Sequence, residues 1–251
     1  MKENLLIVTQ SYSQVLSRCG QIAHENARDS KCHITFKRYH WGEIQRGSMP
    51  LANDPRRRIE LAGQIRRRAA MVESGYVVIA YESLFPAGRD ISRALRKMRA
   101  DGNEHPIFVH AYDPVARALK RQGISRIIVL GDRSQMGLKD IKRFFSRRHG
   151  IQLARYKRCS HLNANAELIY EIIQELRSLH GTDYMSREIV ERYVKDILKE
   201  EKHRKAGAVV ILDADLAKLM KIAKVETIAG LPVFDAWEMF YDELACVIRD
   251  K

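Results

Sequence analysis

Carboxylate, hydroxyl and phenol side chains follow four apolar, strand-like runs of this sequence. If the carboxylates converge, they repel a dicarboxylate and favour an amine, a guanidinium or a metal ion. The candidate site residues are Ser11, Tyr81, Glu82, Ser83, Asp132, Ser134, Asp213 and Asp215. The sequence leaves an alternative open, in which some of these groups turn outward into salt bridges or cap helices. Ser11, for example, could simply cap the helix that follows it.

The elements that would position these residues alternate between strand-like and helix-like patterns. Apolar, β-rich runs predict strands at residues 5–8, 33–39, 76–80, 107–110, 126–130, 151–155 and 208–212. Helical periodicity predicts helices at 15–27, 54–72, 88–100, 114–122, 138–149, 164–179, 187–203 and 214–223. Capping residues agree with this map, notably Asp54 with Pro55, and Gly123 and Gly150. The alternation predicts an α/β fold with parallel sheets, in which ligands bind beyond the carboxyl ends of the strands.

The composition is that of a globular protein. The 251 residues are 45% hydrophobic, which suits one large or two small domains. No apolar run approaches the ~20 residues that cross a bilayer, and the start lacks a signal-peptide pattern. We therefore expect a cytoplasmic protein with no membrane partner. The four cysteines have no Cys-x-x-Cys spacing, so we expect reduced thiols and no metal site.

The net charge of +13 is concentrated in basic clusters at residues 56–58, 66–68, 93–99 and 142–148. Such a surface attracts polyanions through phosphate contacts. The clusters fall within predicted helices, and no zinc-finger or RNA-recognition motif accompanies them. The sequence therefore favours solvated helix faces, whose weak polyanion binding vanishes near physiological salt. A dedicated nucleic-acid site is the alternative.

Several segments, taken in order, resemble the aspartate/glutamate racemase family. They are the strand-like 123–130, the helix-like 166–176 followed by Gly181, the strand 206–212, and the closing segment Leu231-Pro232-Val233-Phe234-Asp235. The resemblance runs from about Tyr76 to Glu243. It is specific in the order and spacing of its segments, but not at the catalytic positions. Asp213-Ala214-Asp215-Leu216 stands where the family typically has Gly-Cys-Thr-Glu-Leu.

The resemblance implies an amino-acid isomerase that needs no cofactor and uses two cysteines. One thiolate removes the Cα proton, and the opposite thiol returns a proton to the other face. These positions map onto Tyr81 and Asp213, and neither loop contains a cysteine. In one alternative, Asp213 forms an acid/base pair with Glu82 or with Tyr81, which would need a carboxyl group with a raised pKa. In the other, the fold persists as a ligand-binding or scaffolding pseudoenzyme. Whether the chain is an enzyme stays open at this point.

The resemblance also implies two pseudo-symmetric lobes, each with a parallel sheet flanked by helices and with the ligand in a cleft between them. We place the lobes at residues 1–105 plus 214–251 and at 106–213. All the candidate residues except Ser11, which follows the first strand, are expected to converge on this cleft. The expected partner is a small amino-acid-like or cationic ligand, and a homodimer is also expected.

Two further residues are interpreted as structural. His110 ends a predicted strand, where a lone histidine is more often a satisfied structural group than a catalytic one. Trp237 is interpreted as a packing aromatic.

Overall fold

The computed structural model describes residues 4–11, 14–26, 33–44, 51, 54–81, 84, 87–100, 106–130, 138–154, 206–222 and 224–249. The chain forms two compact units, Met1–Asp113 with Met239–Lys251, and Pro114–Glu238. The predicted lobes at residues 1–105 plus 214–251 and at 106–213 stay a prediction.

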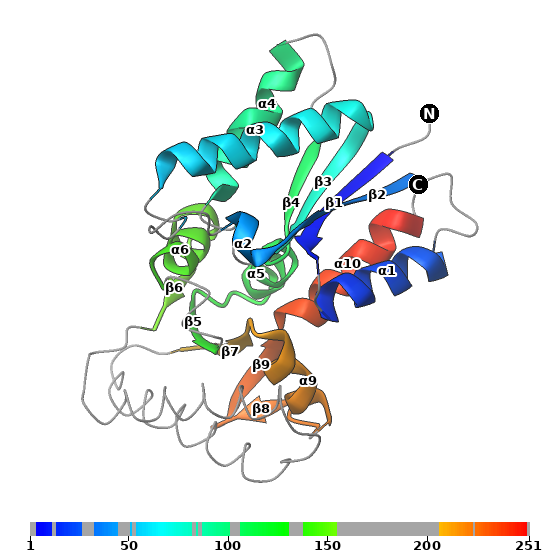
Figure 1. The fold of residues 1–251 in the computed structure, drawn as a ribbon. Helices are drawn as coiled ribbons and strands as arrows, with labels where there is room; N and C mark the ends of the chain where they lie inside the picture. Colours follow the sequence, from blue (N-terminus) through cyan, green and yellow to red (C-terminus); the bar gives the residue numbers. More distant parts are fainter. Residues whose placement is uncertain are drawn as a thin grey trace. The chain divides into compact units, whose positions relative to one another are not determined.

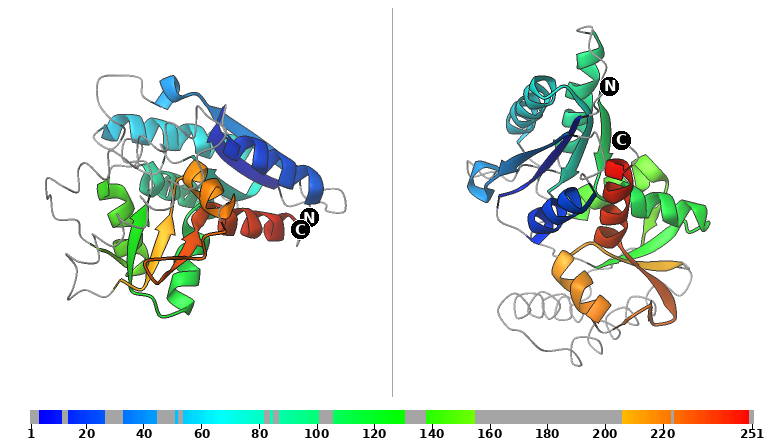
Figure 2. Two further views of the ribbon diagram at one scale, coloured as in Figure 1. Left: turned by 90° about the horizontal axis from the view of Figure 1, so that it is seen from below. Right: turned by 90° about the vertical axis from the view of Figure 1, so that its right-hand side faces the viewer.

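Unit 1 contains a parallel sheet in the order β2-β1-β3-β4. Its strands are β1 (Asn4–Gln10), β2 (His33–Tyr39), β3 (Ser74–Ala80) and β4 (Ile107–His110). The helices between them are α1 (Gln14–Asn26), the short α2 (Trp41–Ile44), α3 (Pro55–Met71) and α4 (Gly88–Ala100). Helices α3 and α4 cover one face of the sheet, and α1 lies on the other beside the C-terminal part of α10 (Ala236–Arg249) (Figures 1 and 2).

The core beneath α3 and α4 follows from the alternation of side chains along the strands. Val77 and Ile79 of β3 point to this face, together with Leu6 and Val8 of β1. The facing helices contribute apolar residues at helical spacing, with Leu61, Ile65, Ile91 and Leu95 all buried. Burying each of these side chains contributes about 1.5 to 3 kcal/mol before the entropy cost of ordering it.

Unit 2 contains a second sheet in the order β6-β5-β7-β9-β8. Its strands are β5 (Arg126–Leu130), β6 (Gln152–Leu153), β7 (Ala208–Ile211), β8 (Thr227–Ile228) and β9 (Leu231–Asp235). The pairings are parallel except between β8 and β9. The helices are α5 (Asp113–Arg121), α6 (Leu138–Arg143), which continues as the π-helical turn η3 (Phe144–Arg148), and α9 (Ala214–Ile222). Helix α10 begins in this unit, and from Met239 it belongs to unit 1.

The predicted α/β class with parallel sheets flanked by helices is confirmed. Asp54 caps α3 by accepting the Arg57 amide at 2.9 Å, and Pro55 occupies the first turn, as expected. Gly123 and Gly150 have φ values of +70° and +72°, the left-handed conformation that follows many helices. The predicted helices at 164–179 and 187–203 lie outside the described residues. No described helix is long and apolar enough to span a membrane.

Three parts of the prediction differ from the structure. The predicted strand 151–155 pairs with β5 only through Gln152 and Leu153. The predicted helix 138–149 changes to π-helical geometry at Phe144. The short helix α2 and the closing elements β8, β9 and α10 were not predicted, although the segment that contains β9 carried part of the family resemblance.

Candidate functional site

The carboxyl ends of β1 and β3 bring two candidate residues to the same edge of the unit 1 sheet. The register pairs Thr9 of β1 with Ala80 of β3, so Ser11 and Tyr81 follow neighbouring strand ends. The Ser11 amide donates to the Tyr39 carbonyl at 2.9 Å, which extends the β1–β2 ladder by one step. Strand-end loops of this kind are where ligands bind in open α/β sheets.

Tyr81 packs into the core of this edge. Its side chain is 5% exposed and belongs to the apolar cluster beneath α3 and α4, continuing the alternation of Val77 and Ile79. The ring thus has an observed packing role, and its predicted catalytic role stays a prediction. Glu82 and Ser83 lie outside the described residues.

His110 takes part in a buried polar turn after β4. Its Nδ1 accepts the Tyr112 amide at 3.2 Å, and its own amide donates to the Asp113 carboxylate at 2.9 Å. His110 and Asp113 are each 3% exposed. These contacts give His110 the structural role predicted for it.

In unit 2, Asp213 follows β7 and caps helix α9. Its carboxylate accepts the Leu216 amide at 2.9 Å, and its carbonyl accepts the Ala217 amide at 2.9 Å. The residue is 4% exposed. The side chain satisfies an N–H group that would otherwise have no partner at the start of the helix. One carboxylate oxygen of Asp213 therefore already accepts a structural hydrogen bond.

Three further candidate residues belong to unit 2. Asp215 belongs to α9, but its side chain lies outside the described part of the structure. Asp132 and Ser134 lie outside the described residues altogether. Their convergence with Asp213 stays a prediction.

The Leu212 peptide, directly before Asp213, is held from two sides. Its amide donates to the Leu130 carbonyl of β5 at 2.8 Å, and its carbonyl accepts the Trp237 indole N–H at 2.6 Å. Trp237 is 3% exposed. It packs as predicted, but it also positions the peptide that carries the candidate carboxylate. The sequence signal for this positioning role was the tryptophan itself, two residues after Asp235 of the closing segment.

Asp235 is a second helix cap in the same unit. One of its carboxylate oxygens accepts the amides of Trp237 at 2.8 Å and Glu238 at 3.1 Å, at the start of α10. Burial raises the pKa of the Asp235 carboxyl, although these two hydrogen bonds act in the opposite direction. Asp213 and Asp235 thus have the same structural task after two neighbouring strands.

The described residues offer no group of three or more His, Cys, Asp or Glu side chains that could hold a metal ion. Cys19 is buried, and burial raises the pKa of its thiol to about 12. Such a thiol remains protonated at neutral pH and is a poor nucleophile or base.

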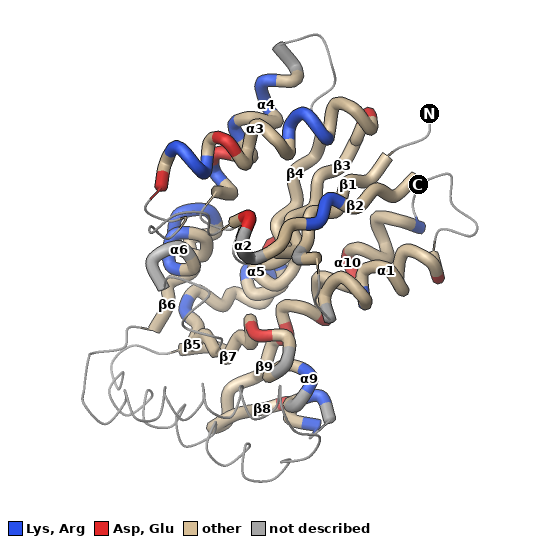
Figure 3. The backbone as a smooth tube through the Cα atoms, in the orientation of Figure 1, with Lys and Arg blue, Asp and Glu red and all other residues tan. Residues whose placement is uncertain are grey.

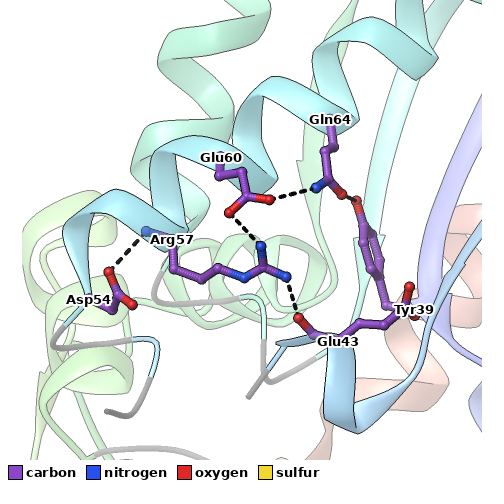
Figure 4. Close-up of polar contacts among 6 residues, drawn as sticks. All are labelled: Tyr39, Glu43, Asp54, Arg57, Glu60 and Gln64. Atoms are coloured by element: carbon purple, nitrogen blue, oxygen red, sulfur yellow. Dashed lines mark hydrogen bonds and ion pairs between the residues drawn. The ribbon is translucent and has the colours of Figure 1, made fainter. Parts of the chain in front are cut away.

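A polar network ties the start of α3 to the turn after β2 (Figure 4). Arg57 pairs with Glu60 at 2.5 Å and donates to the Glu43 carbonyl. Gln64 links Glu60 to the Tyr39 hydroxyl through two contacts of 3.2 Å. Burial, together with the nearby Glu43 carboxylate, raises the pKa of Tyr39 to about 12. The Tyr39 hydroxyl therefore stays protonated at neutral pH.

Solved structures identify the fold. A Yersinia pestis protein assigned to the Asp/Glu racemases is 18% identical, with a TM-score of 0.71 and 99% of each chain covered. An aspartate racemase homologue from Pyrococcus horikoshii OT3 is 14% identical, with the same TM-score of 0.71 and 99% of each chain covered. A glutamate racemase isoform from Bacillus anthracis is 13% identical, with a TM-score of 0.52, and the match covers 100% of this chain and 83% of that one.

No protein-family model and no curated protein matches the sequence. The solved structures confirm the predicted resemblance to racemases for the fold. The loss of the cysteine mechanism stays a prediction.

Trp237→Phe should lower the free energy of unfolding by about 1 to 3 kcal/mol, because the buried Leu212 carbonyl loses its indole donor. Urea unfolding followed by circular dichroism measures the change. An unchanged unfolding free energy would show that this hydrogen bond does not hold the peptide before Asp213.

Asp235→Asn should remove one component of the pH dependence of stability, since asparagine can keep the cap. A raised folded-state pKa means that the native protein holds this proton more tightly than the unfolded chain does. The stabilisation is complete below the unfolded pKa and is lost as the pH rises through the folded pKa. Urea titrations from about pH 4 to pH 7 should therefore show the wild type losing stability relative to the variant as the pH rises. If the difference in unfolding free energy between the wild type and Asp235→Asn stays constant with pH, or changes in the opposite direction, the raised pKa of Asp235 is contradicted.

Proposed function

We propose that this chain is a divergent racemase-like protein that binds a small amino-acid-like or cationic ligand at its strand ends and has lost the two-cysteine mechanism. The observation that carries this proposal is the capping role of Asp213 at the end of β7. The racemase resemblance places a catalytic thiol at this position. Here it holds a buried carboxylate that accepts the Leu216 amide at 2.9 Å.

Proton transfer at an amino-acid Cα sets requirements that this carboxylate meets poorly. The base must reach the Cα hydrogen and bind the proton in competition with water. The Leu216 amide already occupies one oxygen of the Asp213 carboxylate at the start of α9. Asp213 is therefore held as a helix cap, a geometry that suits contact with a positive group better than removal of a carbon-bound proton.

The ligand class follows from the charge of the candidate residues. Glu82, Asp132 and Asp213 supply the acidic groups, and Ser11, Ser83, Ser134 and Asp215 would supply further polar contacts. Such a site disfavours an aspartate-like dicarboxylate and favours a ligand with an amine or a guanidinium group. No metal or cofactor enters this proposal.

The competing function is a retained isomerase in which Asp213 and Glu82 or Tyr81 exchange the proton. A homodimer and a cytoplasmic location complete the proposal.

The purified protein should not exchange the Cα hydrogen of L-aspartate or L-glutamate in deuterated water. The thiols of the family mechanism are missing at both positions, and the acidic site repels a second carboxylate. Proton NMR follows the loss of the Cα signal directly.

Asp235→Asn is a matched control for Asp213→Asn, because both residues cap helices after strands of the same sheet. Exchange that disappears in Asp213→Asn and persists in Asp235→Asn would overturn the proposal and establish carboxylate chemistry.

A further inference from the structure

Helices α3 and α4 carry most of the excess positive charge of the chain. Together they contain eleven Arg and Lys residues and two acidic residues, a net charge of +9. The whole chain has a net charge of +13. Since the two helices pack side by side on one face of the unit 1 sheet, the charge is concentrated in one layer (Figure 3).

Six of these cations are exposed, and we call them the α3–α4 basic surface. They are Arg56, Arg67, Arg89, Arg93, Arg96 and Lys97. None of the six forms an ion pair with another described residue. Within the described part of the chain, these six charges are therefore not neutralised by an ion pair.

The acidic residues of the two helices neutralise other arginines. Glu60 pairs with Arg57 at 2.5 Å, and Asp90 pairs with Arg58 at 3.0 Å. These pairs involve two arginines whose side chains are largely covered, at 13% exposed for Arg57 and 21% for Arg58. The structure thus separates internal ion pairs from an outward-facing basic surface, which the sequence alone did not reveal.

We infer that the α3–α4 basic surface is a docking surface for the phosphate backbone of a nucleic-acid duplex. Five of its six cations are arginines, whose planar guanidinium groups match phosphate oxygens in two-point hydrogen bonds. Rigid helices hold them, so little conformational entropy of the backbone is lost on binding. Phosphate contacts of this kind are independent of base sequence.

The composition of the two helices argues for a duplex over a single strand. Neither helix contains an aromatic residue, whereas single-stranded nucleic acid is usually held by bases stacked on aromatic rings.

The same surface is poorly suited to a membrane. Its large exposed apolar residues on α3 are Ile59 and Met71, at 64% and 74%. At a rise of about 1.5 Å per residue they lie about 18 Å apart along the helix, so they do not form an apolar patch that could enter a bilayer.

The inference is tested by fluorescence anisotropy with a labelled, mixed-sequence duplex of about 20 base pairs, over a salt series from about 50 to 200 mM. The full chain is compared with Arg93→Glu/Arg96→Glu, which reverses two charges of the basic surface. The control is Lys120→Glu/Arg121→Glu on α5, which makes the same change of net charge at two exposed positions.

The wild type should bind with a Kd of about 10⁻⁴ to 10⁻⁶ M near physiological salt. The α4 variant should bind at least tenfold more weakly. The slope of its log binding constant against log salt concentration should fall by the equivalent of about one to two phosphate contacts. The α5 control should change the Kd by less than about threefold, the smaller effect expected of a diffuse field.

Equal losses in the two variants would show that binding follows net charge alone, and would overturn the docking surface. Absence of binding at 50 mM salt would also overturn it. Stronger association with phosphatidylglycerol vesicles than with the duplex would assign the surface to a membrane instead. The inference does not depend on the small-ligand function, because racemisation and ligand assays can fail while duplex binding persists.

Discussion

Parallel strand pairing is the constraint on which the described structure depends. Every described pairing except that of β8 with β9 is parallel, so consecutive parallel strands are joined by a crossing segment and the strand ends meet at one edge of each sheet. Each such end must satisfy backbone N–H groups. Asp113 accepts from His110, Asp213 from Leu216, and Asp235 from Trp237 and Glu238. Acidic residues after strands therefore have a structural use here before any chemistry is considered.

This constraint explains how far the sequence could predict the site. The bounds of β2, β4 and β5 agree with the prediction, because apolar residues, alternating with polar ones in β2 and nearly continuous in β4 and β5, define them. The short helix α2 has only four residues, too few for a periodicity to appear. Tyr81 was placed in the site by its position in a motif. The alternation of Val77 and Ile79 was the competing signal, and it correctly indicates a residue packed in the core.

In the described part of the site, hydrogen bonds hold the Leu212 peptide in place, and the neighbouring Asp213 carboxylate caps helix α9. Leu130 and Trp237 hold Leu212 through hydrogen bonds of 2.8 and 2.6 Å, and Leu216 holds the Asp213 side chain. Long-range contacts of this kind depend on β9 and α10, which the sequence analysis did not assign as elements, so it gave Trp237 only a packing role. The fold thus resembles that of racemases, and at this strand end an aspartate caps a helix.

Isothermal titration calorimetry with L-arginine and L-aspartate tests most directly whether the Asp213 strand end recognises a cationic ligand. The wild type should bind L-arginine, and L-aspartate should produce no measurable binding heat. Asp213→Asn should weaken the arginine complex at least tenfold, about 1.4 kcal/mol, while Asp235→Asn, which alters the equivalent cap of α10, should leave it unchanged. Tighter binding of L-aspartate than of L-arginine, or an equal effect of the two substitutions, would contradict the account.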